Sequence, residues 1–315
     1  MKKVLFLILA CLTMATQASA DMYCYEECCP SVLGFDSVLS FDIGGGYRQD
    51  KFQWKTFPVN NPGTVLHEKW KNMEMGIIET NAQFLACDHY LLKFDFDYGW
   101  FDKQKHQTIT GYDYDTGTVF EYLTSKTRGQ VYDLSAAIGY QINLDCYRIS
   151  VAPLVGWSYY HQRFKNPTYE GLFEGVRGEF TNVHNKSRYS WNGPWLGFAA
   201  AYQICCEWQF YVDYAFHWAE LNGKITDLFL AGAPILGTEY STRIRSSNAY
   251  GNEVTVGTTY QFCEDWYLGF KFNYKDFWTN KGHLSTEILE VREKSPLRST
   301  CWQSFFATVD IGYTF

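Results

Sequence analysis

The sequence predicts an all-β protein, namely a transmembrane antiparallel up-and-down β-barrel of about ten strands, with eight strands as the alternative. Three observations predict it: a secretory signal, segments in which apolar and polar residues alternate, and an aromatic-rich composition without a long apolar run. Aromatic residues make up 19% of the chain, which is typical of strands that end in aromatic girdles at both membrane surfaces.

The first twenty residues have the parts of a signal peptide. Lys2 and Lys3 form a basic start, residues 4–12 form a short apolar run, and residues 18–20 form an Ala-Ser-Ala cleavage site. The apolar run is too short to span a bilayer, which takes about 20 residues. We therefore predict a signal peptide over residues 1–20, a periplasmic cysteine-rich segment over 21–36 and an outer-membrane barrel over 37–315.

The alternation is clearest between Trp266 and Trp278. The even positions there are mostly aromatic or aliphatic and the odd positions are mostly small or charged, so the two sets lie on opposite faces of a strand. Residues 208–218 and 90–100 repeat this pattern. A soluble sandwich also alternates, but apolar-out and polar-in over about ten residues is the signature of a transmembrane barrel.

A pair of residues that begins with Gln recurs at Gln83, Gln141, Gln203 and Gln261. A cysteine and an aromatic-led segment follow each copy, which predicts a strand, a tight turn and the next strand. Because short turns of such barrels face the periplasm and long loops face outside, we expect both termini on the periplasmic side. The predicted strands lie near 37–48, 73–84, 90–102, 130–142, 147–161, 189–204, 208–221, 248–262, 266–278 and 302–315, the second of which alternates poorly. The predicted long loops lie near 55–70, 104–127, 163–187, 223–246 and 280–300.

The last predicted strand ends in Phe315, and Phe305, Val309, Ile311 and Tyr313 share its face. This ending resembles the C-terminal insertion signal of outer-membrane barrels. The resemblance implies that the barrel-assembly machinery is a partner, together with outer-membrane lipid. The net charge of −7 argues against nucleic acid as a further partner.

The predicted register points charges of both signs into the lumen. Side chains just fill a barrel of about eight strands, whereas water channels need about sixteen. Buried charges persist only when they are paired or hydrated, so two interpretations stay open: a polar plug that stabilises the barrel, or a narrow selective pore. The predicted lumen network consists of Asp42, Arg48, Lys93, Asp95, Asp97, Asp133, Arg148, Asp213, His217, Glu253, Lys271, Lys275 and Asp310.

Most cysteines are predicted to lie at the periplasmic end, where the oxidising environment allows disulfides, and Cys301 is predicted toward the outer side. Cys205 and Cys206 are neighbours and cannot easily pair with each other, because that geometry is strained. Cross-links to other envelope proteins and purely internal bridges both stay open, and the spacing of the first three cysteines does not match a standard zinc finger. The disulfide candidates are Cys24, Cys28, Cys29, Cys87, Cys146, Cys205, Cys206 and Cys263.

This layout resembles the cysteine-bearing outer-membrane proteins of chlamydia-like bacteria, and in particular the Protochlamydia outer-membrane protein family. The shared features are cysteines at the barrel turns, an early cysteine cluster and a terminal aromatic strand. The resemblance covers the whole mature chain and rests on cysteine placement rather than on a sharp motif. It implies a structural or narrow-porin role, or a part in a disulfide-linked envelope.

The size and strand count also resemble the omptin proteases, ten-stranded barrels with an acidic pair and an Asp–His pair in the outer rim. The candidates here are Asp95 with Asp97 and Asp213 with His217. The second pair is four residues apart rather than two, and Asp213 lies close to a predicted periplasmic turn. We therefore predict no enzyme activity, no catalytic residue, no cofactor and no metal. An omptin-like protease and an adhesin or receptor that uses its loops are the alternatives.

Overall fold

The structure is a computed structural model that describes residues 37–57, 63–87, 89–144, 148–173, 176–180, 185–227, 240–288 and 291–315. The predicted signal peptide and residues 21–36 lie outside the described residues, as do Cys24, Cys28, Cys29 and Cys146. Within the described residues, no helix is long and apolar enough to cross a membrane. The strands are β1 (Ser37–Thr56), β2 (Thr64–Ala86), β3 (Tyr90–Asp113), β4 (Val119–Tyr140), β5 (Ile142–Leu144), β6 (Ile149–Asn166), β7 (Tyr169–Phe173), β8 (Val176–Phe180), β9 (Asn185–Gln203), β10 (Trp208–Asp227), β11 (Tyr240–Gln261), β12 (Trp266–Thr279), β13 (His283–Ile288) and β14 (Val291–Thr314).

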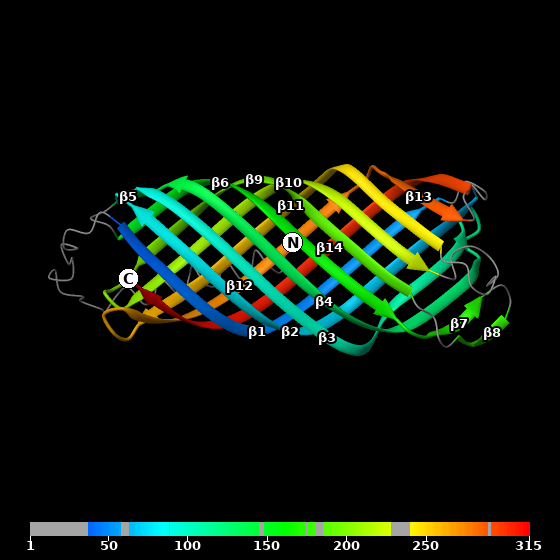
Figure 1. The fold of residues 1–315 in the computed structure, drawn as a ribbon, viewed down its shortest axis with the longest axis horizontal. Coiled ribbons are helices and arrows are strands. Elements are labelled where there is room, and N and C mark those ends of the chain that lie inside the picture. The colour runs from blue at the N-terminus through cyan, green and yellow to red at the C-terminus, as the bar shows by residue number, and fades with distance from the viewer. Residues whose placement is uncertain are drawn as a thin grey trace.

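Ten long strands close into one antiparallel ring (Figure 1). The order around the ring is β1, β2, β3, β4, β6, β9, β10, β11, β12 and β14, and β14 pairs with β1 to close it. The short strands extend the sheet at its ends: β7 and β8 form a hairpin on β4, and β13 lies against β11 and β14. The predicted ten-stranded up-and-down barrel is therefore confirmed, and the eight-stranded alternative is wrong.

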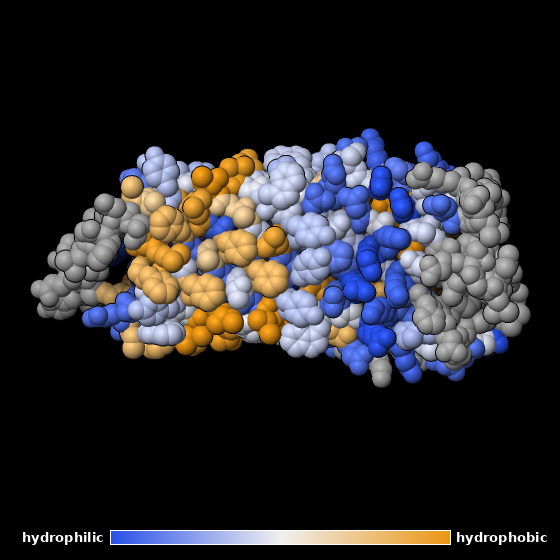
Figure 2. Space-filling model, in the orientation of Figure 1, coloured by the Kyte–Doolittle hydropathy of each residue, from blue (hydrophilic) through white to orange (hydrophobic). Residues whose placement is uncertain are grey.

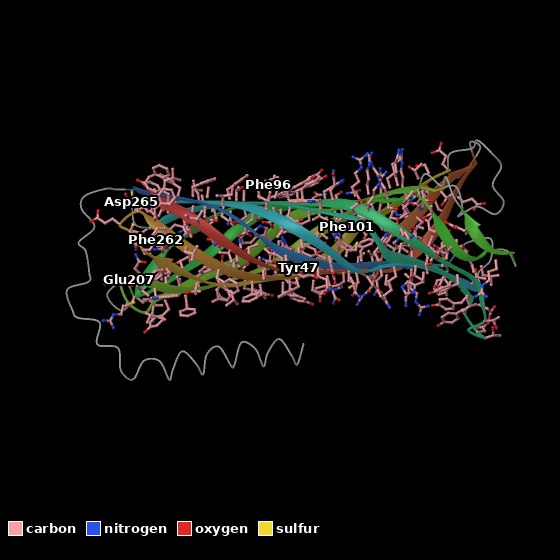
Figure 3. All side chains as sticks on the ribbon, turned by 90° about the horizontal axis from the view of Figure 1, so that it is seen from below. Tyr47, Phe96, Phe101, Glu207, Phe262 and Asp265 are labelled. Atoms are coloured by element: carbon pink, nitrogen blue, oxygen red, sulfur yellow. The ribbon has the colours of Figure 1, made fainter. Side chains whose placement is uncertain are left out.

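The two ends of the barrel differ, and we name its halves accordingly. The turn half ends where β2 leads to β3, β4 to β6, β9 to β10 and β11 to β12, and it carries the described chain end at Phe315. In Figure 3, Glu207, Phe262 and Asp265 lie at this end. The far half carries β7, β8 and β13, which Figure 1 shows at the opposite end.

The strands continue well beyond the lengths that the sequence predicts. The five predicted long loops are wrong over at least half of their length, because strand structure extends into them, as in β2, which begins at Thr64 rather than near residue 73. The physical reason is a reversal of polarity along each strand. In the far half of β1, Phe52 and Trp54 face inward and are fully buried, while Lys51, Gln53 and Lys55 alternate with them and face outward. Apolar-in and polar-out is the soluble pattern, and a search for membrane strands passes over it.

The exterior reflects this reversal (Figure 2): hydrophobic side chains gather on the turn half and hydrophilic ones on the far half. In the turn half, Phe94, Leu196 and Phe270 are large apolar side chains that remain exposed. We call this zone the apolar belt. On β10 it runs from Trp208 to Trp218, which is close to the 9–11 residues with which a tilted strand crosses a bilayer. Tyr47 and Phe96 lie on the exterior in Figure 3.

An irregularity lies just before the second predicted strand, which itself alternates poorly because its first inward side chains, Met73, Met75 and Ile77, are apolar and buried. The pairing of β2 with β3 shifts register between Trp70 and Gly76. Within that interval Asn72 has φ 52°, a left-handed conformation that is uncommon for residues other than glycine and typical of bulges. The inward positions are odd-numbered from Met73 to Glu79 and even-numbered at Glu68 and Trp70. The alternation therefore changes phase inside one continuous strand.

The recurring Gln residues have a structural role at the turns. The backbone N–H of Gln141 donates to the carbonyl of His89 in the preceding turn, and Gln203 and Gln261 do the same to Arg148 and Glu207, at 2.6, 2.7 and 2.8 Å. Successive turns are thereby joined to one another around the rim of the barrel. At the seam, the N–H of Phe315 donates to the carbonyl of Leu39 at 2.7 Å.

Candidate functional site: a charged lumen beneath an apolar core

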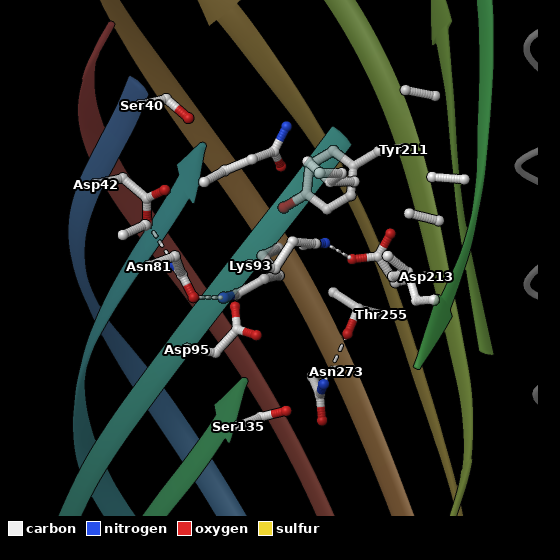
Figure 4. A pocket seen from close by; sticks show the side chains of 18 of the residues that line it. Ser40, Asp42, Asn81, Lys93, Asp95, Ser135, Tyr211, Asp213, Thr255 and Asn273 are labelled. Atoms are coloured by element: carbon white, nitrogen blue, oxygen red, sulfur yellow. Dashed lines mark hydrogen bonds and ion pairs between the residues drawn. The ribbon is translucent and has the colours of Figure 1, made fainter. Parts of the chain in front are cut away.

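A polar cavity of about 510 Å³ occupies the lumen of the turn half. Its lining extends from Gln203 and Gln261 at the turn end to Lys275 and Phe306 near the middle of the barrel. Every second residue of each strand points inward, so the alternation that makes the belt apolar outside supplies polar side chains inside. All ten ring strands contribute to the lining, and Figure 4 shows some of these side chains.

A network of buried ion pairs forms the floor of the cavity. Arg48 donates from Nε to Asp50 at 2.8 Å and from Nη1 to Asp133 at 2.9 Å. Lys275 Nζ lies 2.7 Å from the same Asp133 and 3.5 Å from Glu253. Arg48 and Asp50 are fully buried, so these charges persist because each has a partner of opposite sign.

A histidine and a tyrosine extend this network. His217 Nδ1 lies 3.0 Å from Ser158 Oγ, and His217 Nε2 lies 3.5 Å from Glu253. The hydroxyl of Tyr160 donates to Glu253 at 2.6 Å, and the Tyr160 ring lies 4.4 Å from Lys275 Nζ in a cation–π contact. Both side chains are therefore structural members of the charged layer.

Two further groups of charges line the cavity itself. Lys271 forms an ion pair with Glu79 at 2.8 Å and donates to Asn81 at 3.4 Å, and the hydroxyl of Tyr267 donates to Asp42 at 3.1 Å. These contacts join β12 to β1 and β2 across the intervening β14, so they tie one side of the wall together.

Lys93 and Asp213 form a separate ion pair across the cavity, and Figure 4 shows the two side chains pointing toward each other. Asp95 also lines the cavity, and Asp97 lies 3.6 Å from Lys275. Asp213 is thus occupied by a lysine and is not paired with His217. Three of the four candidates for an omptin-like site thus have different partners: Asp213 pairs with Lys93, Asp97 with Lys275 and His217 with Glu253.

An apolar core fills the lumen of the far half, above the charged floor. Each of the ten ring strands contributes at least one buried side chain to it. Aromatic rings dominate: Trp70 lies 5.3 Å from Phe164, and Phe277 lies 5.2 Å from Trp302, between ring centroids. The fully buried aromatic members include Phe52, Trp54, Trp70, Tyr189, Phe164, Trp191, Phe277 and Trp302. The core thus lies between the charged floor and the far end of the barrel.

The structure places all but one of the predicted lumen residues in the lumen. The exception is Arg148, which lies exposed in the turn before β6 and faces no part of the network, because β6 begins at Ile149 rather than at residue 147. The others face the lumen: Asp42, Arg48, Lys93, Asp95, Asp97, Asp133, Asp213, His217, Glu253, Lys271, Lys275 and Asp310.

Sequence reasoning missed several members of the network. Asp50 stands two positions after Arg48 and so shares its face, but the predicted strand ends at residue 48. Glu79 and Asn81 lie on β2, where they follow the apolar inward residues Met75 and Ile77, so the polar face does not stand out in the sequence. The alternation of β12 is the signal that identifies Asn273, which donates to Glu253 at 2.8 Å.

Among the described residues, three of the predicted disulfide candidates lie at the turns and have free thiols. Cys87 and Cys263 are exposed, and Cys205 is half-buried. Cys206 is disulfide-bonded. Cys301, which is predicted to lie away from the turns, is a free thiol on β14, with Sγ 3.9 Å from an Asp276 carboxylate oxygen. Among the described residues, no group of His, Cys, Asp or Glu side chains is arranged to hold a metal ion.

Comparison with known proteins agrees with this architecture. The model of a family described as "Protochlamydia outer membrane protein" matches residues 42–315. The structure of the outer membrane protease OmpT from Escherichia coli is similar, with a TM-score of 0.73 at 14% identity, over 88% of this chain and 97% of that one. A major outer membrane protein from Thermus thermophilus has a TM-score of only 0.30 at 12% identity, over 86% of this chain and 99% of that one. No curated protein sequence matches.

These matches confirm both resemblances that the sequence suggests. The family match covers most of the chain, and the OmpT match supports the ten-stranded layout. At 14% identity the second match concerns the fold alone. The chain is thus an outer-membrane β-barrel protein, and its activity has to be argued from its own lumen.

Proposed function

Given that the chain belongs to the Protochlamydia outer membrane protein family, we propose that it is a closed structural barrel of the outer membrane rather than a solute channel. In this proposal the turn end and both chain ends face the periplasm, and cysteines there link the barrel to other envelope proteins. Outer-membrane lipid surrounds the belt, and Phe315, which is 72% exposed at the seam, is the contact for the assembly machinery.

The observation that carries the proposal is the apolar core of the far half. A conducting path needs continuous water, but here side chains from every ring strand meet and are buried from solvent. Trp54, Trp70, Trp191 and Trp302 are all fully buried. Interiors of this kind are close-packed, with few voids larger than a water molecule. The polar cavity then has a single mouth at the turn end, and its ion pairs support the wall.

The test is single-channel recording of the refolded chain in a planar bilayer, with and without reductant. We expect no discrete conductance steps from protein that heat-modifiable migration shows to be folded. Regular steps in either condition would mean that the apolar core opens, and would favour the narrow porin instead.

A variant with an enlarged lumen supplies the positive control. Trp70→Ala combined with Trp191→Ala removes two large side chains from the core, whereas Trp218→Ala removes one from the exterior. We expect the first variant, where it folds, to pass ions that the parent and Trp218→Ala do not pass. If the folded double variant also shows no conductance, the barrier to ions lies elsewhere, and the apolar core is not what closes the barrel.

A further inference from the structure

Four neighbouring strands of the far half place a cation at the same register position on their outward faces. Arg163 of β6 pairs with Arg188 of β9, which pairs with Lys224 of β10, which in turn pairs with Arg243 of β11. Opposing residues on one face of an antiparallel pair have Cβ atoms about 4.5–5.5 Å apart, and like charges there repel. This cationic row is therefore destabilising on its own.

A second set of like charges adjoins the row. Arg128 of β4 pairs with Lys165 of β6, and Lys165 pairs with Lys186 of β9. The nearby Arg163 is the largest cause that lowers the pKa of Lys165, and desolvation, Arg128, Lys186 and Arg188 add to it. The surface thus holds its positive charges close enough for them to affect one another.

The protein supplies no counter-charge for this surface among the residues that the structure describes. None of the seven cations forms an ion pair with a carboxylate there. The buried Nε of Arg163 also lacks a hydrogen-bond partner. A buried donor without an acceptor is costly, so both features point to an acceptor from another molecule.

A groove of about 320 Å³ lies beside the row, where the pairing of β10 and β11 shifts register. Arg245 and Lys281 give it a cationic lining, and Glu220 is the one carboxylate among the described residues that line it. Arg245 pairs with Asn222 on one side and with His283 on the other. The groove is therefore two residues, or one outward position, nearer to the apolar belt than the cationic row.

The cationic row lies just beyond the aromatic residues at the edge of the apolar belt, such as Tyr159 and Trp218, which we call the aromatic border. On β6 the outward positions run from Tyr159 through His161 to Arg163, and on β10 Lys224 follows Trp218 by three outward positions. With about 3.3 Å per residue and a strand tilt near 40°, these cations stand roughly 10–15 Å beyond the border. Acyl chains on the belt would bring the sugar headgroup of the same lipid to this height.

We propose that the cationic row and its groove bind the phosphate groups of a phosphorylated glycolipid whose acyl chains pack against the apolar belt. Arg donates two parallel N–H bonds to a phosphate, and Lys contributes a compact charge. The cationic row adjoins the apolar belt, which favours a lipid over a soluble polyanion, because a single lipid can contact the belt with its acyl chains and the row with its phosphates.

The experiment is native mass spectrometry of the full mature chain in phosphatidylcholine nanodiscs, titrated with a diphosphorylated lipid A glycolipid or its dephosphorylated form. Two variants lose the same charge at different places. The row variant combines Arg163→Gln, Arg188→Gln, Lys224→Gln and Arg243→Gln. The control variant combines Lys51→Gln, Lys55→Gln, Lys69→Gln and Lys71→Gln, on the outward faces of β1 and β2.

We expect the parent and the control variant to retain the diphosphorylated glycolipid, and the row variant to bind it at least about ten-fold more weakly. The dephosphorylated form should be lost from all three. Equal binding by the row variant and the parent would overturn the proposal, as would an equal loss in the control variant. So would retention of a heparin oligosaccharide in place of the glycolipid, which would indicate a soluble polyanion site.

Discussion

Single side chains in the lumen differ in the number of charged groups that they contact, and Lys275 lies near three carboxylates. It lies 2.7 Å from Asp133, 3.5 Å from Glu253 and 3.6 Å from Asp97, and it is almost fully buried. Removing it would leave these carboxylates with one cation fewer in a site that excludes water. Loss of one partner from a buried ion pair costs about 3–5 kcal/mol, whereas an exposed charge contributes little.

We therefore expect Lys275→Met to lower the free energy of unfolding by about 3–5 kcal/mol. Lys126→Met, which removes an exposed lysine from β4, should change it by less than about 1 kcal/mol. Denaturant titration in vesicles, followed by tryptophan fluorescence, measures both values. A loss in Lys275→Met no larger than that in Lys126→Met would mean that the network does not stabilise the barrel.

At this scale the sequence is informative because alternation alone assigns a side chain to a face. That rule places Lys93, Lys271 and Lys275 in the lumen, where all three line the polar cavity. It cannot assign partners, because the pairing of Arg48 with Asp133 joins residues on different sides of a closed ring. Partners depend on the ring's curvature, which no local pattern encodes.

Each long strand is an element with two environments, and that is where prediction from sequence fails. The membrane template requires apolar residues outside, so it identifies the turn half of β10 and ends near residue 221. Beyond that point Leu221 and Ile225 face inward and Lys224 faces outward. The alternation is equally regular there, but its sign is reversed, so the template assigns the extension to a loop.

The seam between β1 and β14 provides a test at the scale of elements. A Cβ at Gly46 would stand 1.9 Å from the carbonyl oxygen of Ala307 on β14, while a Cβ at Gly45 would meet nothing nearer than the Ile77 oxygen at 3.5 Å. We expect Gly46→Ala to force the closing strands apart and to destabilise the barrel by about 1–3 kcal/mol. Gly45→Ala should fold like the parent.

The fraction of refolded protein that shows heat-modifiable migration measures this difference. If both alanine variants refold to the same extent, the close approach of the two strands is not needed for closure. A deficit confined to Gly46→Ala would locate the sensitive step at the seam.

Among the residues that the structure describes, three of the four free thiols lie at the turn end of the whole molecule. Cys87, Cys205 and Cys263 lie at three different turns, whereas Cys301 lies on β14 beside Asp276. If these turns face an oxidising periplasm, the exposed thiols can form disulfides with other envelope proteins.

We expect the combined variant Cys87→Ser, Cys205→Ser and Cys263→Ser to lose most of the reductant-sensitive high-mass species in isolated envelopes. Cys301→Ser should keep them. Non-reducing gels of both variants decide between the two sets of cysteines. If the high-mass species are unchanged in the combined variant, Cys87, Cys205 and Cys263 do not link the barrel to other envelope proteins.

The reversal of polarity along each strand has an evolutionary consequence. In the belt, an outward position such as Phe270 has to suit lipid, so few substitutions are compatible with the membrane. In the far half the fold depends on inward residues such as Trp191, and an exposed position such as Lys186 makes little difference to it. Outside the cationic row and its groove, the far surface can therefore drift in sequence while the scaffold stays the same. Substitutions are therefore limited mainly at outward positions on one side of the aromatic border and mainly at inward positions on the other.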